Sequence, residues 1–325
     1  MRPVSQPAFA GLLLALGVAF SATAAAQSWP SKPLRMIVPG APGTSPDLLA
    51  RTIAQYLTPR LSQQIVVANQ PGAGGNLGHG TAAKAAPDGY TLLVTSDQLS
   101  INESLFKDLP FHAVNSFIPV VQAIVSPQVL IVPANFPARD VAELIAYARS
   151  NPGKVNFGSP QLGTVGHLSG ELLKAGQKIN IVHVPFQGAT AAIKEVVAGN
   201  IQMLFVTLPP AVGQIQAGSV RALAVSTPTR NVSFPNVPTM KELGHPEYDF
   251  GAWQGVFAPT GTPQDVVGRL NTDINAILKS PEGSAALIKL GFTPVGGTVD
   301  QFRQLVAATI DKWGKVVKEA NVKAE

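Results

Sequence analysis

One pattern recurs along this sequence and constrains its fold: a short apolar run, a loop rich in glycine and proline, and then apolar residues at helical spacing. In the first copy the apolar run covers residues 34–38, the loop covers 39–43, and the spaced apolar positions run from Leu48 to Leu57. The run has the length of a buried strand, and the later spacing is typical of the apolar face of a helix. The stretch therefore predicts a strand, a loop and a helix start.

The predicted helix start carries residues that favour a capped helix. Ser45 suits the N-cap, and Pro46 suits the first helical position because its missing N–H would have no partner there. Asp47 complements the positive end of the helix dipole. The open N–H groups of such a start suit an anion, although ordinary capping is the better explanation of a single copy. The interpretation therefore depends on repetition of the pattern.

The pattern is repeated twice, after apolar runs at 155–158 and 182–184. In the second copy Thr164 is the expected N-cap, and in the third copy the helix follows Gly188. Three helix starts of this kind around one cleft would hold an anion without a lysine or arginine, because backbone N–H groups and helix dipoles act together.

Strands alternate with helices along the rest of the chain, which predicts an α/β fold with mainly parallel sheets flanked by helices. Two long apolar paths, near residues 124 and 253, are suited to crossing between two domains. We therefore expect residues 27–124 and 254–325 to form domain I and residues 125–253 to form domain II. Because ligands of open α/β sheets bind beyond the carboxyl ends of strands, the glycine loops should face a cleft at the domain interface.

The N-terminal segment has the composition of a secretory signal peptide. An apolar run follows Arg2, and residues 24–26 are three alanines that fit a cleavage site. We expect residues 1–26 to be removed and the mature chain to work in the bacterial periplasm. A retained membrane anchor is the less favoured alternative, because the apolar core is shorter than the roughly 20 residues that span a bilayer.

Composition and motifs argue against nucleic-acid binding and against catalysis. The formal net charge is +5, without long runs of like charge, and there is no cysteine to act as a nucleophile or thiolate ligand. The segment 72–78 departs from the dinucleotide fingerprint because Leu77 takes the place of its third glycine. Residues 104–107 match S-x-x-K without a companion K-T-G, and the five histidines lack metal-ligand spacing. We expect neither an enzyme nor a metal or cofactor, and a hydrolase is a distant alternative.

Several short motifs, taken in order, resemble the tripartite tricarboxylate transporter substrate receptors, also called Bug-type periplasmic binding proteins. The resemblance runs over essentially the whole mature chain, and the order and spacing of the motifs make it specific. The motifs include Gly43-x-x-x-Asp47, Gly72-Ala73-Gly74-Gly75, Pro87-Asp88-Gly89-Tyr90, Gly163-x-x-x-His167-Leu168, Val184-Pro185-Phe186-Gln187-Gly188 and Ala258-Pro259-Thr260-Gly261-Thr262-Pro263.

The resemblance implies a two-domain periplasmic binding protein, type II-like, that closes on a hinge around a small organic carboxylate. It implies permease subunits of a tripartite tricarboxylate transporter as membrane partners, and we expect the protein itself to be a monomer. By position, the ligand loops of the family imply a set of candidate contacts: Gly43, Thr44, Ser45, Asp47, Ser159, Gly163, Thr164, His167, Phe186, Gln187, Gly188 and Ala189.

Several of these candidates have a structural explanation as well. The hydroxyls of Thr44 and Thr164 also suit local capping, and Asp47 suits bracing of its loop better than contact with an anion. His167 equally suits helix packing, and Phe186 suits either a cover for an aromatic ligand or plain core.

One departure from the family bears on the ligand. Val206 stands where the family often has an acid, which weakens the case for a ligand with an ammonium group. We therefore expect a di- or tricarboxylate or an aromatic carboxylate, captured by hinge closure and delivered to the transporter. The alternative is a ligand-sensing receptor that presents its closed form to a membrane signalling partner.

Overall fold

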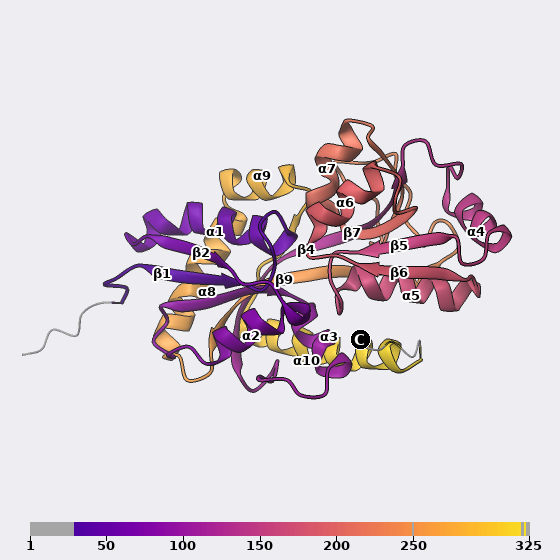
Figure 1. Ribbon diagram of the computed structural model, residues 1–325. Coiled ribbons are helices and arrows are strands. Elements are labelled where there is room, and N and C mark those ends of the chain that lie inside the picture. The colour runs from indigo at the N-terminus through magenta and orange to yellow at the C-terminus, as the bar shows by residue number, and fades with distance from the viewer. Residues whose placement is uncertain (1–28, 249, 320–321, 323–325) are drawn as a thin grey trace, which may run out of the picture.

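A computed structural model of the protein describes residues 29–248, 250–319 and 322. The expected signal peptide at residues 1–26 lies outside the described residues. The elements that follow are those labelled in Figure 1.

Strands and helices alternate along most of the chain, as the sequence predicts. The strands are β1 (Leu34–Val38), β2 (Ile65–Asn69), β3 (Thr91–Ser96), β4 (Phe117–Pro133), β5 (Val155–Ser159), β6 (Ile181–Pro185), β7 (Met203–Thr207), β8 (Val220–Val225), β9 (Gly251–Pro259) and β10 (Thr293–Pro294). The helices are α1 (Ser45–Leu61), α2 (Asn76–Ala83), α3 (Gln98–Leu105), α4 (Val141–Ser150), α5 (Val165–Gln177), α6 (Ala189–Val197), α7 (Leu208–Gln216), α8 (Gln264–Lys279), α9 (Pro281–Lys289) and α10 (Val299–Glu319), with short 3₁₀ turns at Ala73–Gly75 and Pro246–Tyr248.

The strands form one curled sheet in the order β2-β1-β3-β9-β4-β7-β5-β6, and β8 and β10 also pair with β4. Strands β1 to β3 form one parallel set, and β5 to β7 form another. The described pairs that β4 and β9 make are antiparallel. The sheet is therefore mixed: it contains two parallel sets, as the sequence predicts, and the antiparallel pairs of β4 and β9 join them.

Strand β4 links the two sets because it changes partner along its length. Its residues 117–127 pair with β9, whereas residues 128–133 pair with β7 and β8. Figure 1 shows β4 and β9 passing through the middle of the molecule, with β1 and β2 on one side and β5 and β6 on the other. The two long apolar paths of the sequence are these two strands.

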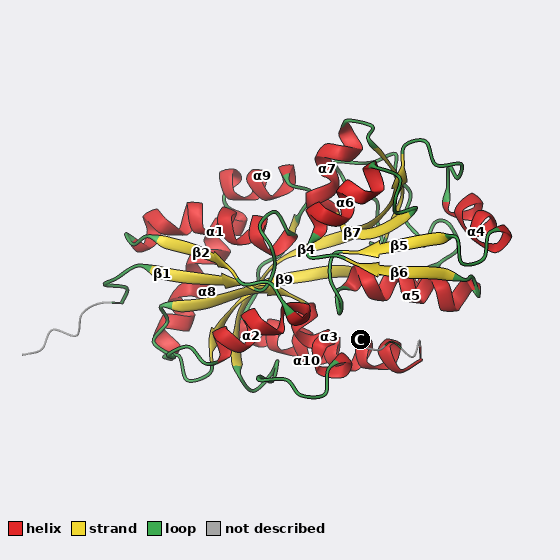
Figure 2. Cartoon of the chain, viewed as in Figure 1, coloured by secondary structure: helices red, strands yellow, loops and turns green. Residues whose placement is uncertain are grey.

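Helices cover both faces of the sheet, with α1, α6, α7 and α9 on one face and α2, α3, α5 and α10 on the other (Figure 2). Their apolar stripes form the core: Leu49 and Ile53 of α1 pack in one cluster with Leu270 and Ile274 of α8. None of the helices in the described ranges is both long enough and apolar enough to cross a bilayer.

The C-terminal helix α10 is anchored to β9 by an aromatic cluster. The Phe302 side chain is buried, and its ring centroid lies 5.2 Å from that of Trp253 and 4.9 Å from that of Phe257. Aromatic rings at these separations stabilise each other beyond the area that they bury. Helix α10 is therefore part of the core that supports β9.

Replacing Phe302 with Ala should remove this anchor and leave a cavity. We expect the free energy of unfolding to fall by about 3–5 kcal/mol, measured by chemical denaturation. The matched control is Arg303→Ala on the same helix, whose half-exposed side chain pairs with Asp300 and should change the stability by no more than about 0.5 kcal/mol. Equal effects of the two substitutions would contradict this account of α10.

Candidate functional site

A cavity lies where the carboxyl ends of the two parallel strand sets face each other. It measures about 590 Å³ when the open solvent at its mouth is included. Strands β1, β3, β5, β6 and β7 each lead into a helix at this cavity, and the N-cap or first residues of those helices line it. The lining residues are Thr44, Ser45 and Pro46 for α1, Asp97 and Gln98 for α3, Thr164, Val165 and Gly166 for α5, Gly188 and Ala189 for α6, and Thr207 for α7. Five helix N-termini therefore surround one space, as in other open α/β sheets.

The loops before α1 and α5 have the same local structure. In each, a glycine has a positive φ, +81° at Gly43 and +71° at Gly163, which a side chain would strain. The following threonine is the N-cap, and its hydroxyl donates to the carbonyl three residues earlier, at 2.8 Å for both Thr44 and Thr164. The two loops are therefore held in one shape that places their helix starts at the cavity.

Asp47 and His167 brace these two loops from equivalent positions. The N–H of Gly43 donates to Asp47 Oδ2 at 2.9 Å, and the N–H of Gly163 donates to His167 Nδ1 at 3.4 Å. Burial opposes ionisation of Asp47, but hydrogen bonds from Arg51, Gly43 and Asn69 outweigh it and hold the pKa of this carboxyl below its usual value. Neither Asp47 nor His167 lines the cavity.

The start of α1 corrects one detail of the predicted cap. Thr44, with extended backbone angles, is the N-cap, and Ser45 is the first helical residue. The hydroxyl of Ser45 instead accepts a hydrogen bond from Gln254 Nε2 on β9. The reason for the shift is that the buried Gln254 amide needs a partner, and Ser45 supplies it from inside the helix.

The other candidates are distributed unevenly around the cavity. Gly188 and Ala189 line it, whereas Phe186 is half-buried against a core cluster and Gln187 is exposed. Ser159 is buried behind the loop, where its hydroxyl lies 2.8 Å from His183 Nε2. The structure thus brings Thr44, Ser45, Thr164, Gly188 and Ala189 together at the cavity. The other candidates do not line it: Gly43, Asp47, Ser159, Gly163 and His167 lie in or behind its loops, and Phe186 and Gln187 lie away from it.

Backbone N–H groups supply the hydrogen-bond donors of the site. The N–H groups of Val165, Gly166 and Ala189 are at buried residues and have no hydrogen-bond acceptor among the described residues. Helices α1 and α7 offer fewer donors because prolines occupy their first turns. None of the described residues that line the cavity is Lys, Arg or His. An anion here would be held by the starts of α5 and α6.

The floor of the cavity is polar, and sequence reasoning missed it. Asp97, Gln128 and Gln254 line the cavity and are at most 3% exposed. Burial raises the pKa of Asp97 to about 8, so its carboxyl is largely neutral at pH 7. Gln128 and Gln254 are polar residues within the apolar runs that become β4 and β9. A single polar residue in such a run is the weak sequence signal that indicates these two positions.

Contacts across the cavity connect the two strand sets. Gln98 Nε2 donates to the Leu162 carbonyl at 3.0 Å and to Gln161 Oε1 at 3.3 Å. Thr44 lies close to Gly188, where an added Cβ would be 3.5 Å from the Thr44 methyl. The loops of both sets therefore meet over the cavity.

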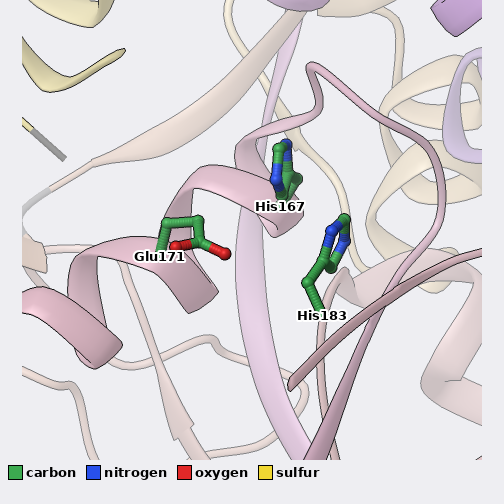
Figure 3. Close-up of side chains that lie close together, drawn as sticks. All are labelled: His167, Glu171 and His183. Atoms are coloured by element: carbon green, nitrogen blue, oxygen red, sulfur yellow. The ribbon is translucent and has the colours of Figure 1, made fainter. Parts of the chain in front are cut away.

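His167, Glu171 and His183 lie together behind the α5 loop, with potential ligand atoms within 4.8 Å of one another (Figure 3). The two imidazole rings are stacked, with centroids 4.2 Å apart and planes 17° apart. A metal ion lies near the plane of each ring that binds it, and two stacked rings do not share a plane. Glu171 also pairs with Lys174 at 3.6 Å. The cluster is better explained as two neutral stacked rings that support the loop.

Comparison with known proteins gives the chain its relatives. The family described as the tripartite tricarboxylate transporter family receptor matches residues 49–322. Protein BugT of Bordetella pertussis is 37% identical, over 96% of this chain and 98% of BugT.

Solved structures agree with this result. An R. palustris protein solved with adipate superimposes with a TM-score of 0.88 at 33% identity, covering 91% of this chain and 99% of that one. MatC from Rhodopseudomonas palustris, solved with malate, has a TM-score of 0.85 at 31% identity, covering 89% of this chain and all of MatC. The α/β fold expected from the sequence, that of a periplasmic binding protein, is confirmed.

The buried histidines predict how stability depends on pH. Burial lowers the pKa of His79 to about 3, of His167 to about 4 and of His183 to about 3, from about 6.5 in the unfolded chain. Below pH 6.5 the unfolded chain binds protons that the folded chain does not, so the free energy of unfolding should fall as the pH is lowered from 6.5 toward 4. Asp97 has the opposite effect on the free energy of unfolding, because burial raises its pKa. The three histidines together outweigh this single carboxyl.

Urea denaturation between pH 7 and pH 5 measures this dependence. The slope of stability against pH should be shallower in His183→Gln than in the wild type. Gln55→Ala, at an exposed side chain that does not titrate, is the control and should keep the wild-type slope. A wild-type slope in His183→Gln would show that His183 is not held neutral by the fold.

Proposed function

Because the chain belongs to the tripartite tricarboxylate transporter receptor family, whose members are periplasmic binding proteins and not enzymes, we propose that it captures a small organic carboxylate. The ligand binds in the cavity between the two strand sets and is delivered to the membrane permease of a tripartite transporter. Export by the expected signal peptide at residues 1–26 places the protein in the periplasm.

One observation carries the proposal: Val165, Gly166 and Ala189, at the starts of α5 and α6, are buried residues that line the cavity, and their N–H groups lack acceptors in the part of the chain that the structure describes. A buried N–H without a partner is rare in folded proteins, so a ligand that accepts hydrogen bonds is the natural occupant. Hydrogen bonds to a charged group contribute about 1.5–3 kcal/mol each. Micromolar affinity needs about 8 kcal/mol, so four to six such bonds suffice after the cost of ordering the ligand.

The relatives support a carboxylate as this ligand. The two R. palustris structures hold adipate and malate, and both molecules carry carboxylates. Their similarity covers 91% and 89% of this chain.

Capture proceeds by closure of two domains on a hinge. Domain I contains residues 27–124 and 254–325, and domain II contains residues 125–253. The boundaries fall in β4 and β9, and β4 exchanges β9 for β7 as its partner just beyond the first boundary, between Pro127 and Gln128. Contacts such as Gln98 with Leu162 would form on closure and add to the stability of the ligand-bound state.

A bulky side chain at either helix start should block binding. In Thr44→Phe and Thr164→Phe the ring would fill the cavity, and we expect the affinity for carboxylate to fall at least about a hundredfold, measured by calorimetric titration. The titrated carboxylate is chosen by a thermal-shift screen of di- and tricarboxylates and aromatic carboxylates, since ligand at a hundred times its Kd stabilises by about 2.7 kcal/mol.

Thr298→Phe is the matched control for the loss of a threonine cap. The Thr298 hydroxyl accepts from the Gln301 N–H at 3.2 Å, much as Thr164 accepts from His167 at 3.3 Å, but it lies away from the cavity. The control should bind as the wild type does. Unchanged affinity in both cavity variants would refute the site, and a screen in which only neutral sugars or cations bind would refute the carboxylate.

A further inference from the structure

Helices α3 and α10 pack against each other and reach from one core cluster of the protein into another. The first cluster surrounds Phe257 of β9, and the second contains Val165 and Leu168 of α5. Figure 1 shows the end of α10 lying beside α5, which follows a strand of the other parallel set. The two helices contribute Leu99, Phe302 and Val306 to the first cluster, and Ile101, Leu105, Trp313 and Val317 to the second. The helix pair therefore bridges the two strand sets.

The end of α10 is buried against domain II, although residues 254–325 are proposed above to form domain I. Trp313 is 4% exposed, and its ring centroid lies 5.2 Å from that of Phe250, with the ring planes 75° apart. Phe250 is fixed to domain II, because its N–H donates to the Ser226 carbonyl at 2.9 Å. Val317, one turn beyond Trp313, is buried in the same cluster. This end of α10 therefore packs in the core of domain II.

Helix α3 contacts the loop that leads to the start of α5. Gln98 Nε2 donates to the Leu162 carbonyl at 3.0 Å. The next residue, Gly163, lies so close to α3 that an added Cβ would be 3.2 Å from Leu105 Cδ2 and would clash with Asn102 Oδ1. The first of the N–H groups proposed to bind the anion follows two residues later. Helix α3 therefore holds this loop in the shape that places those donors at the cavity.

We propose that α3 and α10 form a clasp that docks on domain II when the protein closes, and that Leu105, Trp313 and Val317 are its positioning residues. None of the three lines the cavity, so they act on affinity without touching the ligand. This inference rests on the proposed function, because it presupposes a carboxylate that is captured by closure.

The clasp acts on the balance between open and closed protein. Burial of apolar side chains on docking favours the closed state, and an aromatic side chain such as Trp313 buries the largest area. The apparent Kd equals the intrinsic Kd divided by the fraction of closed protein. Loss of the clasp should therefore weaken the binding of every ligand by the same factor.

Two valines of α10 provide a matched pair of variants. Val317 lies in the cluster shared with domain II, whereas Val306 lies in the first cluster, and both are buried. We expect the Kd to rise at least about threefold in Val317→Ala and at least about tenfold in Trp313→Ala. Val306→Ala, which also loses buried methyl groups, should keep the Kd within about twofold of the wild-type value. Trp313→Phe keeps an aromatic ring and should bind more tightly than Trp313→Ala.

The probes for these titrations are malate, adipate and benzoate, each used if it binds the wild type. Calorimetric titration should give the same rise in Kd for each of them, because the clasp does not contact the ligand. Stopped-flow measurements should assign the change to faster dissociation, with the association rate constant within about threefold of the wild-type value. A residue that merely stabilises the fold would lower the denaturation midpoint and leave these constants unchanged.

Fluorine NMR of protein labelled with 5-fluorotryptophan observes docking of the clasp directly. The Trp313 resonance, assigned from its loss in Trp313→Phe, should show a solvent isotope shift between H₂O and D₂O in the ligand-free protein and lose it when ligand binds. The Trp29 resonance is the internal control and should keep its isotope shift, because Trp29 packs beside Tyr90 in domain I in both states.

The outcomes separate the clasp from the proposed function. If carboxylates bind and both Trp313→Ala and Val317→Ala keep the wild-type Kd, the clasp is wrong and the proposed function stands. If Trp313 is equally shielded from solvent with and without ligand, the end of α10 does not undock and the clasp is overturned. If none of the carboxylates in the thermal-shift screen binds the wild type, the proposed function fails and the clasp fails with it.

Discussion

The need to satisfy buried polar groups at the centre of the molecule governs the rest of the structure. Two sets of parallel strands direct their carboxyl ends toward one cavity, and each strand there leads into a helix whose first N–H groups have no intrahelical acceptor. Loop hydrogen bonds satisfy some of these groups, as at His167, whose N–H donates to the Thr164 hydroxyl. Those of Val165, Gly166 and Ala189 have no acceptor among the described residues, and we propose that a ligand supplies it. The loops, their glycines and the residues that brace them all serve to hold these donors in place.

The same principle explains why the loops are braced differently on the two sides of the cavity. On α1, Asp47 is charged and is surrounded by Arg51, Asn69 and the Gly43 N–H. On α5, His167 is neutral and stacks on His183. Both side chains accept from the glycine four residues earlier, so different chemistry produces one loop shape. Neither brace adds a positive charge at the cavity, and the N–H groups therefore remain its principal attraction for an anion.

Much of this arrangement could be predicted from the sequence, because its causes are local. The glycine loops, the N-cap at Thr164 and the long runs that become β4 and β9 each depend on residues that are close together in the chain. The antiparallel pairing of β4 and β9 could not be predicted from local patterns, because it depends on how distant segments pair. The floor was missed for the same reason: Asp97, Gln128 and Gln254 come from three separate segments and meet only in the fold. Ser45 was misplaced by one residue because its partner, Gln254, lies 209 residues away.

The central claim is that backbone N–H groups at two helix starts bind the carboxylate. The most direct measurement is the amide spectrum of the isotope-labelled protein by NMR, recorded as a bound carboxylate is titrated in. A charge-assisted hydrogen bond to an N–H shifts its proton resonance downfield, so the account predicts large downfield shifts at Val165, Gly166 and Ala189, with smaller shifts elsewhere. Saturable binding that leaves these three resonances in place and moves the amides of another surface would contradict it.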